Sequence, residues 1–169
     1  MNKNDKCPHS LVIHVANQTL EHRDHNGQWL KTYMISTALK GVGERKGSYC
    51  TPRGQHIIRA KIGEGLAENA VLVARRFTGE YFSPELYAQY PGRDWILTRI
   101  LWLSGCEVGK NRLGECDTMR RYVYIHGTPD STPLGVAGSK GCIRMRNADI
   151  VELFDRVPIY TTVSIEGDL

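Results

Sequence analysis

Several features are missing from this chain of 169 residues. It has no Cys-x-x-Cys or His-x-x-x-His pair, so the common zinc patterns are absent and no metal or other cofactor is expected. It has no apolar run near the ~20 residues that a membrane-spanning helix needs, so no membrane association is expected. The net charge is only +4, and the basic residues are scattered apart from short pairs at 75–76 and 120–121. Without a basic run interleaved with aromatic residues, binding to nucleic acid is not expected.

A secretory signal is also missing from the start of the chain. Residues 1–8 are polar, and the apolar run 11–16 is short and contains His14, whereas a signal peptide needs an apolar core of about 7–15 residues. The five cysteines are odd in number and irregularly spaced, which fits a reducing compartment better than a disulfide framework. A bridge between Cys106 and Cys116 is the alternative. The sequence therefore predicts a cytoplasmic protein with the free thiols Cys7, Cys50, Cys106, Cys116 and Cys142.

The length predicts one domain over residues 1–169, large enough to bury a core. Short β-prone runs follow one another, and Asn26-Gly27 marks a tight hairpin turn. Strands are expected at 11–15, 19–23, 29–36, 55–62, 71–77, 122–125 and 159–165, while the apolar run 96–103 fits either a strand or a buried helix.

Two short helices are expected among the strands. Ser83 followed by Pro84 is a capping residue with proline in the first turn, and predicts a helix to about residue 90. Residues 147–156 have apolar side chains at helical spacing, with Asn147 as the expected cap. Many short strands and few helices predict a mostly β sandwich.

Two strings carry the chemistry, residues 125–128 (IHGT) and 139–144 (SKGCIR). A thiol with an unperturbed pKa of about 8.5 needs a nearby base to become a nucleophile at neutral pH. A strand end would present His126, and the Pro- and Gly-containing loop after it would return Cys142 beside it. The alternative is a buried, inert cysteine near an unrelated histidine.

These strings resemble the catalytic motif of the L,D-transpeptidase catalytic domain family, also called YkuD. That motif is a His-Gly or His-Ser pair, a spacer, and Ser/Thr-His-Gly-Cys followed by a hydrophobic residue and Arg or Asn. Lys140 stands where the family usually has His, and residues 51–54 match the family's Thr-Pro-x-Gly turn. The likeness covers roughly residues 11–163 and implies the family's β-sandwich with one or two short helices. The matching motif residues are His126, Gly127, Ser139, Gly141, Cys142, Ile143 and Arg144.

The resemblance implies acyl transfer through a thioester, in which His126 takes the proton of Cys142 and the thiolate attacks a peptide carbonyl. The backbone N–H of Cys142, with that of Gly141 or Lys140, is expected to stabilise the oxyanion. No Asp or Glu lies in the motif, and the resemblance points to the carbonyl of Gly127 as the group that orients His126.

The remaining motif residues are assigned to substrate binding. Arg144 would emerge on the same side as Cys142, and its fork suits a substrate carboxylate; a structural ion pair is the alternative. Ser139 and Gly141 shape the turn before the cysteine, and for Ser139 a purely turn-forming role is the alternative. Lys140 cannot accept a hydrogen bond while charged, which puts in doubt any role that requires an imidazole there.

The family's substrate is the stem peptide of bacterial peptidoglycan, cleaved between the diamino acid at position three and a terminal D-Ala. A cytoplasmic enzyme would meet free or nucleotide-linked tetrapeptides, and water would be the most abundant acceptor. The sequence thus predicts an L,D-carboxypeptidase of peptidoglycan recycling, with carbapenem-type β-lactams as acylating inhibitors. An L,D-transpeptidase and a catalytically silent module that binds stem peptides are the alternatives.

Overall fold

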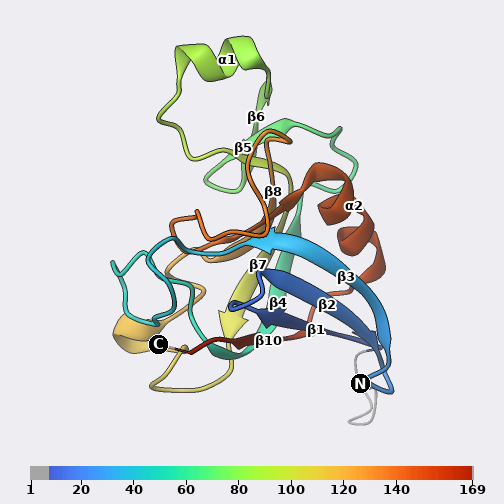
Figure 1. The fold of residues 1–169 in the computed structure, drawn as a ribbon, viewed down its shortest axis with the longest axis vertical. Coiled ribbons are helices and arrows are strands. Elements are labelled where there is room, and N and C mark those ends of the chain that lie inside the picture. The colour runs from blue at the N-terminus through green and yellow to red at the C-terminus, as the bar shows by residue number, and fades with distance from the viewer. Residues whose placement is uncertain (1–7, 169) are drawn as a thin grey trace.

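The computed structural model describes residues 8–168, so Cys7 and residues 1–7 of the polar N-terminal segment lie outside the described part of the chain. Strands dominate, with two short α-helices and one 3-10 turn among them, which confirms the prediction of a mostly β fold (Figure 1). In chain order the elements are β1 (His9–His14), β2 (Thr19–Asp24), β3 (Trp29–Ser36), β4 (Gly54–Ile62), β5 (Ala70–Val73), β6 (Arg76–Tyr81), α1 (Pro84–Gln89), β7 (Ile96–Gly105), η1 (Gly114–Cys116), β8 (Tyr124–Thr128), β9 (Ile143–Arg146), α2 (Asn147–Arg156) and β10 (Thr162–Glu166).

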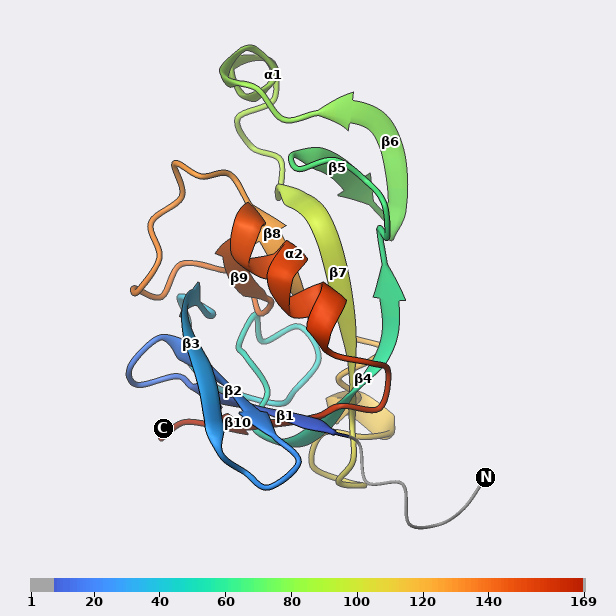
Figure 2. The same cartoon turned by 90° about the vertical axis from the view of Figure 1, so that its right-hand side faces the viewer.

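The strands of the described chain form one sheet in the order β4-β10-β1-β2-β3-β9-β8-β7-β5-β6. A further pairing between β4 and β7 closes this sheet into a ring, so that it curls and its inner faces pack together (Figure 2). The neighbours β1–β10 and β8–β9 are parallel, and the other pairs are antiparallel. The hairpin β5–β6 continues beyond β7 and carries α1 away from the ring (Figure 1).

Helix α2 covers the part of the sheet that bears the strings 125–128 and 139–144, and lies against β7, β8 and β9 (Figure 2). Its apolar residues Ile150, Leu153 and Phe154 are buried in the same core as Ile125 of β8 and Ile143 of β9. Burying each of these side chains stabilises the fold by about 1.5–3 kcal/mol relative to exposure. No helix of the described residues is both long and apolar enough to span a bilayer.

The structure resolves one alternative that the sequence left open and differs from two of the sequence expectations. The ambiguous run 96–103 is strand β7, which is buried along most of its length because it pairs with β4, β5 and β8; such a strand reads as a continuous apolar run. The single strand expected over 71–77 is interrupted by a turn at Ala74-Arg75. Asn147 is not the cap of α2: Arg146 holds that position, and the Asn147 side chain is buried beneath the helix start.

Candidate active site

The two predicted reactive residues lie on one face of two neighbouring strands. In the parallel pair β8–β9, Ile125 is opposite Ile143 and His126 is opposite Arg144. Side chains alternate along a strand, so His126 lies on the same face as Arg144 and as Cys142, two residues earlier. His126 and Cys142 are therefore diagonal neighbours across the strand pair.

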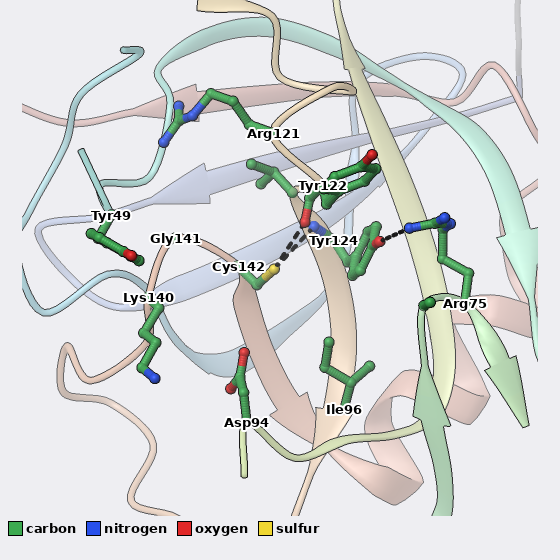
Figure 3. Close-up of a pocket in the computed structure, with 12 residues that line it drawn as sticks. Tyr49, Arg75, Asp94, Ile96, Arg121, Tyr122, Tyr124, Lys140, Gly141 and Cys142 are labelled. Carbon is green, nitrogen blue, oxygen red and sulfur yellow. Dashed lines mark hydrogen bonds between the residues drawn. The ribbon is translucent and has the colours of Figure 1, made fainter. Parts of the chain in front are cut away.

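The thiol of Cys142 is held by the backbone of the segment before β8. The Tyr124 N–H donates to Sγ at 3.4 Å, and the thiol donates to the Tyr122 carbonyl at 3.4 Å (Figure 3). Burial raises the pKa of Cys142 to about 12; the nearby Asp94 carboxylate adds to the rise, and the Tyr124 N–H opposes it. The resting group at neutral pH is therefore the thiol, already bonded to a donor that will stabilise the thiolate.

His126 is prepared as a neutral base. Its ring is 1% exposed, and Nδ1 lies 2.7 Å from the Gly127 carbonyl oxygen. A carbonyl only accepts, so the proton of the neutral ring resides on Nδ1 and the lone pair on Nε2. Burial lowers the pKa of His126, and the bond to Gly127 only partly opposes this. The contact with Gly127 is the one that the family resemblance pointed to.

The turn before Cys142 is braced by side-chain hydroxyls. Ser139 Oγ accepts from the Gly141 N–H at 3.2 Å and donates to the Cys142 carbonyl at 2.5 Å, so the Gly141 N–H is engaged within the turn. Gly141 has φ +128°, which disfavours any side chain. Thr51, the first residue of the Thr-Pro-x-Gly turn, donates from Oγ1 to the Gly141 carbonyl at 3.0 Å. The two motifs of the sequence are thus parts of one turn assembly.

The end of β8 is fixed by a buried amide. Asn147 Nδ2 donates to the Thr128 carbonyl at 3.0 Å, and Asn147 Oδ1 accepts from Thr98 Oγ1 at 2.5 Å. A Cβ on Gly127 would lie 2.6 Å from this Oδ1 and 2.6 Å from the Leu97 carbonyl. Only glycine fits there, and the packing fixes the carbonyl that orients His126.

Arg144 is engaged by its own surroundings. Its Nη1 donates to the Gly138 carbonyl at 3.1 Å, and Nη2 lies 3.5 Å from Asp94 Oδ1. These contacts are the structural ion pair that the sequence left as the alternative, and Arg144 does not line the cavity beside Cys142. Its role toward substrate stays a prediction.

A cavity of about 550 Å³ opens beside Cys142. It has three basic side chains and one acidic one, and several aromatic rings (Figure 3). The sequence predicted only the motif residues Lys140, Gly141 and Cys142 among those that line this cavity. The basic pairs 75–76 and 120–121 were the only sequence signal for the rest, since each pair contributes one arginine to the lining. The residues it missed are Tyr49, Ala74, Arg75, Asp94, Ile96, Arg121, Tyr122, Val123 and Tyr124.

The buried His56 and the remaining cysteines lie outside the proposed reactive pair. His56 is 1% exposed and lies between the Gly54 carbonyl and Thr118 Oγ1, each at 3.0 Å, so it does not border the cavity. Among the described residues Cys50, Cys106, Cys116 and Cys142 are free thiols, and the alternative bridge between Cys106 and Cys116 is not formed.

The chain matches the family described as L,D-transpeptidase catalytic domain (YkuD) over residues 8–165. It is 51% identical over 45 residues to "Probable L,D-transpeptidase ErfK/SrfK" of Salmonella typhimurium, a segment that spans 27% of this chain and 15% of that protein. Its fold is similar to L,D-transpeptidase 3 of Mycobacterium tuberculosis with a faropenem-derived adduct (TM-score 0.57, 15% identity, 95% of this chain and 61% of that chain). It is also similar to LD transpeptidase LdtMt1 in complex with imipenem (TM-score 0.55, 17% identity, 95% and 59%).

Proposed function

Because the chain belongs to the L,D-transpeptidase catalytic domain family, we propose that it is a cysteine acyl-transfer enzyme that removes the terminal D-Ala from a peptidoglycan tetrapeptide. The observation that carries this proposal is the register of β8 and β9, which makes His126 of β8 a diagonal neighbour of Cys142. Cys142 directly precedes β9 and lines a cavity of about 550 Å³. The chain spans 15% of the curated relative and about three fifths of the solved structures, so the whole reaction belongs to the proposal.

In the first half of the reaction, His126 Nε2 takes the proton from Cys142 Sγ as the sulfur attacks the carbonyl carbon of the scissile bond. The Tyr124 N–H, already bonded to the sulfur, stabilises the developing thiolate. The tetrahedral oxyanion would be met by the backbone N–H of Cys142. The C–N bond then breaks, the imidazolium protonates the leaving amine, and D-Ala departs from a thioester.

In the second half, water replaces the amine. His126 takes a proton from the water as its oxygen attacks the thioester carbonyl, and the C–S bond breaks with return of the proton to sulfur. The products are a tripeptide with a free carboxylate and the original thiol. Cys142 is partly exposed, which favours access of water to the thioester.

The proposed location is the cytoplasm, where free or nucleotide-linked tetrapeptides would be the substrates. The four free thiols of the described chain support it, because reduced cysteines are typical of that compartment. Fractionation of cells that express the native protein tests it, and recovery in the periplasm would contradict it.

We further propose that carbapenem-type β-lactams acylate Cys142. Support comes from the fold, which is that of two proteins whose structures contain imipenem and a faropenem-derived adduct. Incubation with imipenem should add one drug-derived mass to the native protein and none to the variant Cys142→Ala.

The deciding experiment is incubation of the purified protein with a disaccharide tetrapeptide, with and without an added D-amino acid, followed by mass analysis. Tripeptide should dominate in both samples. Dimers or exchanged D-amino acids at modest acceptor concentration would replace the hydrolase with the L,D-transpeptidase that the relatives' names favour. Binding without any product would leave a silent stem-peptide module.

A further inference from the structure

Arg75 occupies a strained turn beside the cavity. Val73 pairs with Arg76, so Ala74 and Arg75 form the two-residue loop of the β5–β6 hairpin. Their φ angles are +46° and +64°. Turns of this kind favour Asn-Gly or Asp-Gly, because residues other than these carry a conformational cost at positive φ. Strained backbone positions cluster at functional sites, so the Arg75 side chain is a candidate for a functional role.

The guanidinium of Arg75 is fixed by three aromatic residues. Its Cζ lies 4.8 Å from the ring centroid of Trp102 and 4.9 Å from that of Tyr122. Its Nη1 donates to the Tyr124 hydroxyl at 3.0 Å (Figure 3). Tyr124 and Tyr122 are the residues whose backbone groups bond to the sulfur of Cys142. One tyrosine side chain thus separates the guanidinium from the segment that holds the nucleophile.

Arg75 also has fewer polar contacts than the other arginines near Cys142, so more of its donors remain for a ligand. A guanidinium has five N–H donors. Arg121 donates hydrogen bonds to three backbone carbonyls and a serine hydroxyl, and these bonds brace the loop 43–50. Arg144 is engaged by Gly138 and Asp94. Within the described residues Arg75 makes one hydrogen bond and no ion pair, and it lines the cavity.

We propose that Arg75 binds the carboxylate of the peptide's terminal residue, the one that leaves. This inference rests on the proposed function. In a C-terminal residue only the amide nitrogen and Cα separate the carboxylate from the scissile carbonyl carbon. A carboxylate receptor about one tyrosine length from the sulfur therefore suits removal of a terminal residue. The planar fork matches a carboxylate in two parallel hydrogen bonds.

The test compares three tetrapeptides: one with free carboxylates, one amidated at its C-terminus, and one amidated at the side carboxylate of the diamino acid. Arg75→Gly is the informative variant, because glycine relaxes the positive φ and the hairpin should keep its turn. Its thermal unfolding checks this. Arg76→Ala, which removes an exposed cation from the same hairpin outside the cavity, is the matched control.

Arg75→Gly should lower kcat/KM for the free peptide by about 10- to 100-fold, mainly through KM, because it removes hydrogen bonds to a charged group. The C-terminal amide should be an equally poor substrate for the wild type and Arg75→Gly, while Arg76→Ala behaves as the wild type. If Arg75→Gly instead loses discrimination against the side-chain amide, the terminal assignment is overturned.

Binding measured by calorimetry in the Cys142→Ala background separates this inference from the proposed function. There the free peptide should bind more tightly than its C-terminal amide, and Cys142→Ala/Arg75→Gly should bind both alike. Turnover by the wild type with no discrimination between acid and amide would overturn the role of Arg75 alone. If the protein neither turns over nor binds any stem peptide, the proposed function is overturned, and this inference with it.

Discussion

The charge state of the reactive pair gives a sharp prediction about thiol chemistry. Burial raises the pKa of Cys142 to about 12 and lowers that of His126, so thiol and imidazole are both neutral at rest. An ordinary cysteine has a pKa of about 8.5, and Cys142 should therefore contain about 10³-fold less thiolate between pH 7 and 8. Alkylation needs the thiolate, so its rate without substrate should rise about tenfold per pH unit from pH 7 to 9 without a plateau.

The assay is the pH dependence of iodoacetamide labelling, resolved by peptide mass so that Cys142 is followed separately from the other thiols. Cys142→Ala verifies the peptide assignment, and circular dichroism at each pH verifies that the fold persists. A thiolate–imidazolium pair would instead give a rate that is high and flat from about pH 5 upward. Such a profile would refute the neutral pair and the electrostatic argument from burial.

Four further predictions concern single substitutions. Cys142→Ala should abolish turnover while the thermal unfolding midpoint stays near that of the wild type; turnover at the wild-type rate would end the nucleophile assignment. His126→Gln should lower kcat by about 10²–10⁴, and an unchanged kcat would point to another base. Gly127→Ala should destabilise the fold by about 1–3 kcal/mol in urea unfolding, since its Cβ would meet the Leu97 carbonyl, and an unchanged midpoint would contradict this. Burial lowers the pKa of His56 from 6.5 to about 4 in the folded chain. As pH falls, the unfolded chain therefore binds a proton at His56 first, and the folded state loses stability between about pH 6.5 and 4. Between pH 7 and 4.5 that loss should be about 2–3 kcal/mol, and it should shrink in His56→Gln.

Local patterns were sufficient for most of the strands. The β-prone run after the Asn26-Gly27 turn predicted 29–36 as a strand, and β3 has these bounds. The helical spacing of Ile150, Leu153 and Phe154 likewise predicted α2, because those side chains must share one buried face. The order of strand, loop and Gly-Cys turn predicted that the chain would return beside the strand that carries His126, and β9, which directly follows Cys142, pairs with β8.

Other details depend on contacts distant in sequence. The turn at Ala74-Arg75 carries no glycine or asparagine, so no local signal marks its positive φ values. Asn147 has the residue type of a cap, but Thr98 and Thr128 engage its amide instead. The Arg75 stack on Trp102 joins the β5–β6 hairpin to strand β7, and no spacing rule predicts it.

The site geometry explains how Lys140 can stand where the family usually has histidine. The Lys140 side chain is exposed at the cavity edge, and it makes no hydrogen bond or ion pair within the described residues. Orientation of His126 comes from the Gly127 carbonyl, and the thiol of Cys142 is held by Tyr122 and Tyr124. An imidazole at position 140 is therefore not needed to assemble the reactive pair. What the lysine changes is the cavity, to which it adds an exposed positive charge that favours an anionic over a cationic ligand.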